Sequence, residues 1–243
     1  TAKQSHGVSE TLIDYNRSGN PLVEIVSEPD ISSGSEAVEF IEKVSETLKY
    51  LDVSNVKMEE GSMRCDVNIS LRPYGYEHLG NKVEIKNLNS LNNISKAIEY
   101  EIERQSKLLN SGQVILEETR RFDESSLSTV LMRVKDETVD YKYFVEANII
   151  PVLLTKEFID DVKDNLPELA SARFARYLAV GMEDYDAQVI INNKELSDFF
   201  DEVLKNTDEI KMAANWTISE VLAVVNKEQI EITSLKLDPK QLA

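Results

Sequence analysis

Residues that commonly crosslink chains or hold soft metals are scarce in this sequence of 243 residues. It contains a single cysteine, Cys65, and two histidines, His6 and His78. One cysteine cannot form a disulfide within the chain, and a structural zinc site needs about four Cys or His ligands. We therefore expect any bound metal to be a hard cation held by oxygen atoms.

Long apolar runs are missing as well. The longest apolar run covers about 149–154, far too short to span a membrane, and residues 1–20 contain no signal-peptide core. Glycine and proline number only 8 and 6, while 42% of the residues are hydrophobic, which argues against a disordered or fibrous protein. We expect a globular protein without a membrane partner, in the cytoplasm or in an organelle of bacterial origin.

Basic residues are few compared with acidic ones. The chain has 27 Lys and Arg residues against 44 Asp and Glu residues, a formal net charge of -17. Affinity for phosphate backbones comes mainly from Lys and Arg, so a general polyanion binder is disfavoured. A local basic patch or a partner subunit can still contact nucleic acid, and charge leaves that alternative open.

The periodicity of apolar residues predicts an α+β protein in two parts, 1–155 and 156–243. In the first part, two long helices alternate with the strands of a mixed sheet; the helices are predicted at 35–51 and 91–110, and the strands at 22–27, 53–59, 63–72, 82–86, 117–122 and 129–134. The second part is helical throughout, with predicted helices at 156–164, 167–180, 183–191, 194–205 and 208–226. The boundary lacks a Gly/Ser-rich linker, so we expect the two parts to pack together.

The predicted strand at 22–27 contains an acid among apolar neighbours. Glu24 lies within Leu-Val-Glu-Ile-Val, a sequence apolar enough for a core strand. An unpaired ionised carboxylate costs several kcal/mol to bury. Glu24 therefore needs a metal, a cation or water within reach.

Two further predicted strands each carry a row of polar side chains. The first row consists of Arg64, Asp66, Asn68 and Ser70, and the second of Glu84, Lys86, Asn87 and Asn89. Such rows are commonly a solvated sheet face. Carboxylates, amides and a lysine fixed on strands also suit Mg²⁺ and phosphate, which favours a site for phosphoryl transfer. The residues alone leave both interpretations open.

One basic cluster stands out in the acidic chain. It comprises Arg120, Arg121, Arg133 and Lys135, on two neighbouring predicted strands. These side chains can pair with the nearby acids Asp123, Glu124 and Asp136, or they can contact phosphate or a nucleotide tail. Neither alternative is excluded by the sequence.

Several longer segments together resemble the B subunits of the aspartyl/glutamyl-tRNA amidotransferases. In chain order they are DYNRSGNPLVEIVSEPD, VKMEEGSMRCDVNISLRP, EIKNLNS, ETRRFDE, LMRVKDETVDYKYF, YDAQVI and ELSDFFDEV. They span nearly the whole chain in a fixed order, which is far more specific than one short motif.

The resemblance implies a cradle-shaped, kinase-like domain in 1–155 and a helical domain in 156–243. Its activity would be ATP-dependent amidation: the side-chain carboxylate of Glu-tRNA(Gln) or Asp-tRNA(Asn) is phosphorylated with ATP and Mg²⁺, and ammonia then displaces the phosphate. The ammonia would come from glutamine hydrolysed in a partner A subunit, through a channel, and a small C subunit would complete the heterotrimer.

The resemblance also assigns roles to residues of this chain. Glu24 matches a carboxylate of the family's Mg²⁺ site. The implied catalytic residues, in the cradle and at the channel mouth, are Asp66, Lys86 and Arg64. The candidates for contact with substrate or nucleotide are Asn68, Asn87, Asn89, Arg120 and Arg121.

The chain also departs from the family's pattern. Where the family commonly reads Tyr-Phe-Pro-Glu-Pro-Asp, this chain has Tyr-Phe-Val-Glu-Ala-Asn at 143–148. We expect the N-terminal part of the cradle and the C-terminal tail domain to be missing and the piece alone to be inactive. A non-catalytic alternative is a binding module whose helical part and Arg120/Arg121 pair hold RNA or partner subunits.

Overall fold

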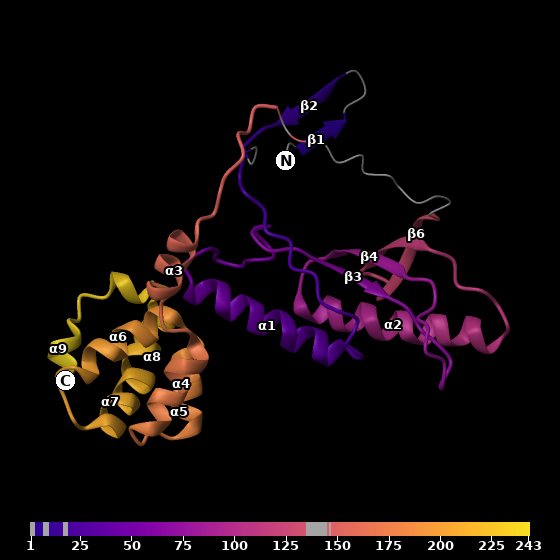
Figure 1. Cartoon of the computed structure of the whole chain (residues 1–243). Helices are drawn as coiled ribbons and strands as arrows, with labels where there is room; N and C mark the ends of the chain where they lie inside the picture. The colour runs from indigo at the N-terminus through magenta and orange to yellow at the C-terminus, as the bar shows by residue number, and fades with distance from the viewer. Residues whose placement is uncertain (1–2, 7–9, 17–18, 135–144, 146) are drawn as a thin grey trace. The chain divides into compact units, whose positions relative to one another are not determined.

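The chain forms two compact units, Thr1–Ser32 and Ser33–Ala243, in the computed structural model (Figure 1). Residues 3–6, 10–16, 19–134, 145 and 147–243 are described. In the first unit, strands β1 (Lys3–His6) and β2 (Thr11–Asp14) form an antiparallel pair. Residues 20–28, which follow, have no regular secondary structure.

The second unit contains a four-stranded sheet, two long helices and a series of shorter helices. The long helices are α1 (Gly34–Tyr50) and α2 (Leu91–Asn110), and the strands are β3 (Cys65–Ile69), β4 (Val83–Leu88), β5 (Glu118–Asp123) and β6 (Ser128–Val134). The shorter helices are α3 (Lys156–Asp164), α4 (Ala170–Ala179), α5 (Asp184–Ile191), α6 (Lys194–Leu204), α7 (Ile210–Trp216), α8 (Leu222–Glu228) and α9 (Pro239–Leu242). These elements confirm the predicted α+β class. Among the described residues, no helix is both long and apolar enough to cross a membrane.

Both long helices begin at a serine cap. The Ser33 hydroxyl accepts a hydrogen bond from the Glu36 amide, and the Ser90 hydroxyl accepts one from the Asn93 amide, each at 3.2 Å. These bonds satisfy amides that have no partner within the first helical turn. The helices predicted at 35–51 and 91–110 are both confirmed.

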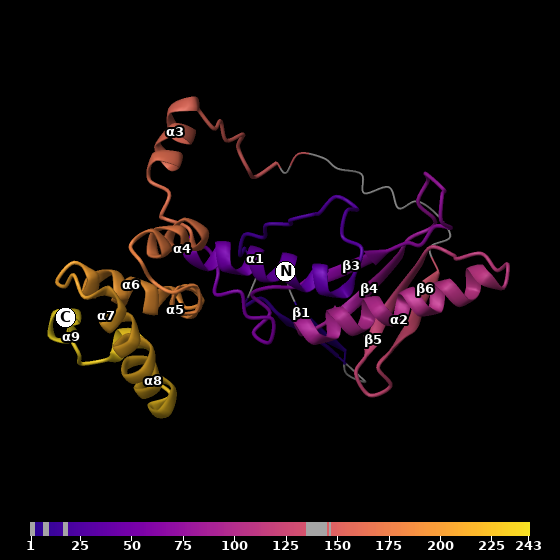
Figure 2. The ribbon, with the colours of Figure 1, turned by 90° about the horizontal axis from the view of Figure 1, so that it is seen from below.

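The sheet has the strand order β3-β4-β5-β6 and is mixed. Strands β4 and β5 are parallel, with α2 as the connection between them, and the outer pairs are antiparallel. Figures 1 and 2 show α1 and α2 on the same side of the sheet. Val83 and Ile85 of β4 and Ile94 and Ala97 of α2 are fully buried, so the core lies between α2 and the sheet.

Two strand predictions are wrong. Residues 22–27 form no strand, and their apolar side chains are exposed, Leu22 by 89% and Val23 by 80%. A strand needs a paired neighbour as well as apolar residues, and none is paired with this segment among the described residues. Residues 53–59 form no strand either: 54–57 have no regular secondary structure, and 58–59 lie in a turn. Asp52 and Val56 have φ angles of 55° and 47°, which an extended strand does not contain.

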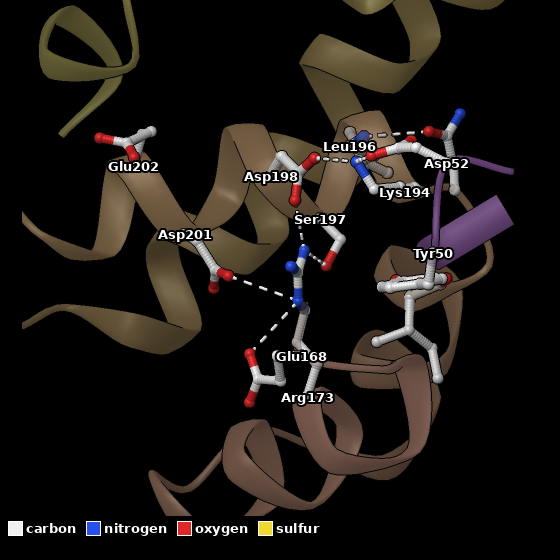
Figure 3. Close-up of polar contacts among 12 residues, drawn as sticks. Tyr50, Asp52, Glu168, Arg173, Lys194, Leu196, Ser197, Asp198, Asp201 and Glu202 are labelled. Atoms are coloured by element: carbon white, nitrogen blue, oxygen red, sulfur yellow. Dashed lines mark hydrogen bonds and ion pairs between the residues drawn. The ribbon is translucent and has the colours of Figure 1, made fainter. Parts of the chain in front are cut away.

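The helical part has its own apolar core, to which α5, α6 and the α7–α8 region contribute. Tyr177, Leu196, Phe200 and Val203 are fully buried within it. The predicted helix at 208–226 is interrupted, because a π-helical turn, Thr217–Val221, separates α7 from α8. Tyr50, at the end of α1, lies beside Arg173 of α4 (Figure 3). Its hydroxyl joins α1 to the helical part by donating a hydrogen bond to the Ile191 carbonyl at 2.8 Å. The predicted domain boundary near residue 155 stays a prediction.

Gly34 is expected to resist substitution because α1 and α2 approach closely there. A Cβ atom at this position would lie 2.7 Å from Ser95 Oγ, 2.9 Å from its carbonyl oxygen and 3.0 Å from its Cα. Gly34→Ala should lower the free energy of unfolding by about 1–3 kcal/mol in urea titrations, the usual effect of overpacking. The gain in helix propensity, about 1 kcal/mol, is smaller than this strain.

The same prediction has an internal control. Adding Ser95→Gly to Gly34→Ala removes only one of the three close atoms, so we expect partial recovery of stability. Complete recovery would mean that the Ser95 hydroxyl alone opposes the added methyl group. It would contradict the explanation that the backbone of α2 lies too close to residue 34.

Candidate active site

Polar side chains collect on the face of the sheet opposite α2. We call this the polar face; its members are Asp66 and Asn68 of β3, Glu84 and Lys86 of β4, Thr119 and Arg121 of β5, and Arg133 of β6. Asn68 lies opposite Glu84 in the register, Thr119 beside Glu84, and Arg121 beside Lys86. Side chains alternate along a strand, so the buried Val83 and Ile85 on the α2 side leave Glu84 and Lys86 on the other.

A chain of contacts crosses the polar face. The Lys86 ammonium lies 2.8 Å from Asp66 Oδ2 and 3.0 Å from Glu84 Oε1. Glu84 Oε2 accepts a hydrogen bond from the Thr119 hydroxyl at 3.0 Å, and that hydroxyl accepts one from Arg133 Nε at 3.4 Å. The contacts therefore link all four strands of the sheet.

The electrostatics of the polar face differ between its two sides. The hydrogen bond to Asp66 raises the pKa of Lys86; partial burial opposes the change, and Glu84 adds to it. Lys86 is thus a cation at neutral pH and cannot act as a base or nucleophile there. The β3–β4 side holds two carboxylates and one ammonium, whereas the β5–β6 side holds the guanidinium groups of Arg121 and Arg133.

The structure brings together some of the predicted residues but not others. Asp66 and Lys86 are in direct contact, and Asn68 lies on the same face. Arg64 directly precedes β3 and is exposed. Asn87 is exposed near the end of β4. Asn89 lies in the link to α2, where it lines a separate groove with residues of α1 and of the loop at 56–63.

Arg120 and Arg121 point to opposite faces of β5. Arg120 faces α2, where its Nη1 donates to Glu118 at 2.7 Å, its Nε donates to the Thr129 hydroxyl at 2.8 Å, and Glu101 lies 3.3 Å away. Arg121 is about half exposed on the polar face, with Asp123 at 3.8 Å. The two arginines therefore do not form a single cluster, and contact of either with phosphate or nucleotide stays a prediction. Lys135 and Asp136 lie outside the described residues.

Glu24 belongs to the first unit, where it is exposed. The premise that it lies in a buried strand is therefore wrong. Among the described residues, no group of three His, Cys, Asp or Glu side chains is arranged to hold a metal ion. These residues do not make a complete Mg²⁺ site, and the assignment of Glu24 to a metal stays a prediction.

Sequence reasoning missed Thr119 and Glu101, and it named Arg133 in the basic cluster without placing it on the polar face. Thr119 and Arg133 join the polar face through strand pairing between β4, β5 and β6, which only the register reveals. Glu101 is fully buried, and its position does have a signal: it continues the buried stripe of α2 that contains Ile94, Ala97 and Ile98. The changed segment at 143–148 lies mostly outside the described residues.

Comparison with known proteins gives the family of the chain. The family model for the GatB/GatE catalytic domain matches residues 1–160, and a second model, described as a GatB domain, matches residues 198–243. Relatives named as the B subunit of aspartyl/glutamyl-tRNA(Asn/Gln) amidotransferase include those of Lysinibacillus sphaericus, 48% identical over 242 residues, and Enterococcus faecalis, 48% identical over 243 residues. The relative of Staphylococcus aureus strain MRSA252 is also 48% identical, over 242 residues. Each alignment covers 99% of this chain and 51% of the relative, so the chain spans about half the length of the curated relatives it matches.

Proposed function

Because the chain belongs to the GatB/GatE catalytic domain family, we propose that it serves in ATP-dependent amidation of Glu-tRNA(Gln) or Asp-tRNA(Asn). The observation that carries the proposal is the 48% identity to amidotransferase B subunits over 99% of the chain. Its partners in this proposal are a glutamine-hydrolysing A subunit, a C subunit and the misacylated tRNA, and its co-substrate is ATP. The proposed place of action is the cytoplasm or an organelle of bacterial origin.

The reaction needs two substitutions. An oxygen of the aminoacyl side-chain carboxylate attacks the γ-phosphorus of ATP, and ADP leaves. Ammonia then attacks the activated carbonyl carbon, phosphate leaves with the oxygen that had attacked the phosphorus, the other oxygen remains as the amide carbonyl, and the nitrogen loses a proton. A carboxylate oxygen is a poor leaving group until it is phosphorylated, so both steps benefit from fixed charges around the transferred group.

The two sides of the polar face suit the incoming ammonia and the leaving phosphate of the second step. Around Lys86, the carboxylates of Asp66 and Glu84 give a net negative charge, which favours ammonium or ammonia over phosphate. One of these carboxylates can accept the proton that the nitrogen releases. Arg121 and Arg133, on the other side, suit the leaving phosphate. Arg64 remains a proposed catalytic residue, and Asn68, Asn89 and Arg120 remain proposed neighbours of the substrate or nucleotide.

Mg²⁺ would spread the charge of the transferred phosphoryl group, as it does in phosphoryl transfer generally. Glu24 is the proposed carboxylate contact of this ion. The described residues do not complete such a site, so no step is assigned to the metal here.

The proposal is tested by replacing the matching half of the Enterococcus faecalis relative with this chain and assembling it with A and C subunits. The chimera should convert Glu-tRNA(Gln) to Gln-tRNA(Gln) in an ATP-dependent manner. Lys86→Met should lower the rate by about tenfold, because the carboxylates beside the ammonium lose their fixed partner. The matched control is Lys205→Met, which removes an exposed lysine paired with Glu202 on α6. Equal rates in all three proteins would exclude the polar face from the reaction.

A further inference from the structure

Strand β4 contains a β-bulge next to the Lys86 contacts. Cys65 pairs with Leu88 and Val67 pairs with Ile85, so one residue of β3, Asp66, faces two residues of β4. Those two are Lys86 and Asn87. Bulges bend a strand locally and change the direction of its side chains, and they are frequent beside active sites.

The bulge changes which face the following residue occupies. With strict alternation after the buried Ile85, Lys86 would lie on the polar face, Asn87 on the α2 side and Leu88 on the polar face. Instead, Asn87 is exposed and Leu88 is 5% exposed. The extra residue thus lets Leu88 remain in the core while Lys86 lies opposite Asp66.

Asn87 makes this geometry possible through its backbone. Its φ angle is 63°, in the left-handed region that asparagine and glycine adopt much more readily than other residues and that is strained for β-branched ones. In the described part of the chain, no hydrogen bond is found for its exposed side chain. The bulge therefore depends on the backbone conformation of Asn87 and not on its side-chain amide.

We propose that Asn87 is a positioning residue, whose left-handed backbone forms the bulge that holds the Lys86 ammonium between Asp66 and Glu84. The consequence for amidation rests on the function proposed above, whereas the geometric part does not. Asn87 was predicted from the sequence as a contact of substrate or nucleotide; this inference gives it a different, indirect role.

The test compares substitutions that differ in their tolerance of a left-handed φ. Asn87→Gly keeps the conformation and removes the amide, whereas Asn87→Val keeps a side chain and opposes the conformation. The readout is the titration of the Lys86 side chain in the 243-residue chain, followed by ¹³C NMR of the lysine Cε atoms and assigned with Lys86→Met. We expect the pKa of Lys86 to stay raised in Asn87→Gly and to move down toward the ordinary lysine value in Asn87→Val.

Two results would overturn the proposal: an unchanged Lys86 titration in Asn87→Val, or an equal change in Asn87→Gly and Asn87→Val, which would assign the effect to the amide. If Asn87→Val does not fold, Asn87→Ala serves in its place, because alanine is less strained at this φ angle than valine. Its Lys86 titration should then lie between those of Asn87→Gly and the ordinary value.

Amidation by the chimera provides a separate readout. Asn87→Gly should keep the rate within about twofold, and Asn87→Val should lower it by about tenfold, as a small misplacement of a reacting group can. A changed Lys86 titration with an unchanged rate would support the positioning role and count against the proposed function of the polar face. The two proposals can therefore fail independently.

Discussion

Glu101→Ala is expected to lower the free energy of unfolding by about 3–5 kcal/mol, the usual cost of removing one partner from a buried ion pair. Glu101 is fully buried on the face of α2 that packs on the sheet. Arg104 donates two hydrogen bonds to its carboxylate at 2.9 Å, Gln105 donates one at 3.0 Å, and the Thr129 hydroxyl donates another. Arg120 of β5 lies 3.3 Å away.

This large effect follows from what the substitution leaves behind. Without Glu101, Glu118 is the only acid among the described residues that remains near the Arg104 and Arg120 guanidinium groups. Thr129 and Gln105 also lose an acceptor in the interior. Buried donors without acceptors cost free energy because water cannot replace the lost partner. Since the network ties α2 to β5 and β6, its loss should also loosen the two strands that carry Thr119, Arg121 and Arg133.

Chemical denaturation of three variants tests this account. Glu101→Gln keeps the shape and some hydrogen bonds, so its loss should be smaller than that of Glu101→Ala. Glu103→Ala, which removes an exposed acid two residues away, should change stability little, because its partner Lys107 is equally exposed. If Glu101→Ala and Glu103→Ala had similar stability, the buried network would not contribute as described.

Stability should also depend on pH through Glu101. Burial opposes ionisation of this carboxyl, but hydrogen bonds from Arg104, Thr129 and Gln105 outweigh burial and hold its pKa below the ordinary value. The ionised Glu101 therefore contributes fully to the free energy of unfolding above its unfolded-state pKa. This contribution is lost as the pH falls through its folded-state pKa. The difference in stability between the unaltered chain and Glu101→Gln should shrink below about pH 4.

The features that the sequence predicted well depend on local interactions. Helices α1 and α2 each have a serine cap and an apolar stripe within the same segment, so neighbouring residues determine both ends. Asp66 and Lys86 were also named in advance as members of polar rows on predicted strands, although no contact between them was predicted. Two antiparallel neighbouring strands bring such rows together on one face.

The features that the sequence did not predict depend on distant partners. Residues 22–27 have the composition of a strand but no paired neighbour among the described residues, and composition cannot supply one. The bulge at Lys86 and Asn87 appears only when β3 and β4 are aligned. The separation of Arg120 from Arg121 is different, because side chains alternate between the two faces of a strand and the sequence alone therefore implies it. Grouping the two adjacent arginines in one basic cluster ignored this alternation.

A second buried ion group joins α4 to α6 beside the end of α1 (Figure 3). Arg173 is 8% exposed, and its Nη1 donates to Ser197 Oγ at 2.8 Å and to Asp198 Oδ1 at 2.6 Å. Its Nε lies 3.5 Å from both Glu168 and Asp201. The same guanidinium stacks over the Tyr50 ring, 5.2 Å from its centroid. One side chain thus connects the helical part with α1.

Arg173→Ala should lower the free energy of unfolding by about 3 kcal/mol, near the lower end of the range for a broken buried pair. The loss is limited because Asp198 keeps Lys194 and Asp201 keeps Arg176 as partners. Arg173→Lys should recover only part of the loss, since an ammonium cannot reach the same acceptors in a fixed planar arrangement. The exposed pair of Lys211 and Glu183 supplies the control, and Lys211→Ala should change stability little.

Hydrogen exchange distinguishes a general loss of stability from the loss of this particular connection. If Arg173 joins α1 to the helical part, Arg173→Ala should speed amide exchange at the C-terminal turn of α1 and in α4 and α6 more than in β4 and β5. Exchange that rises equally in all these elements would show that the arginine contributes only to global stability. A selective rise at Tyr50 would mean that the cation over the aromatic ring, with the acids around it, keeps the end of α1 attached to α4 and α6.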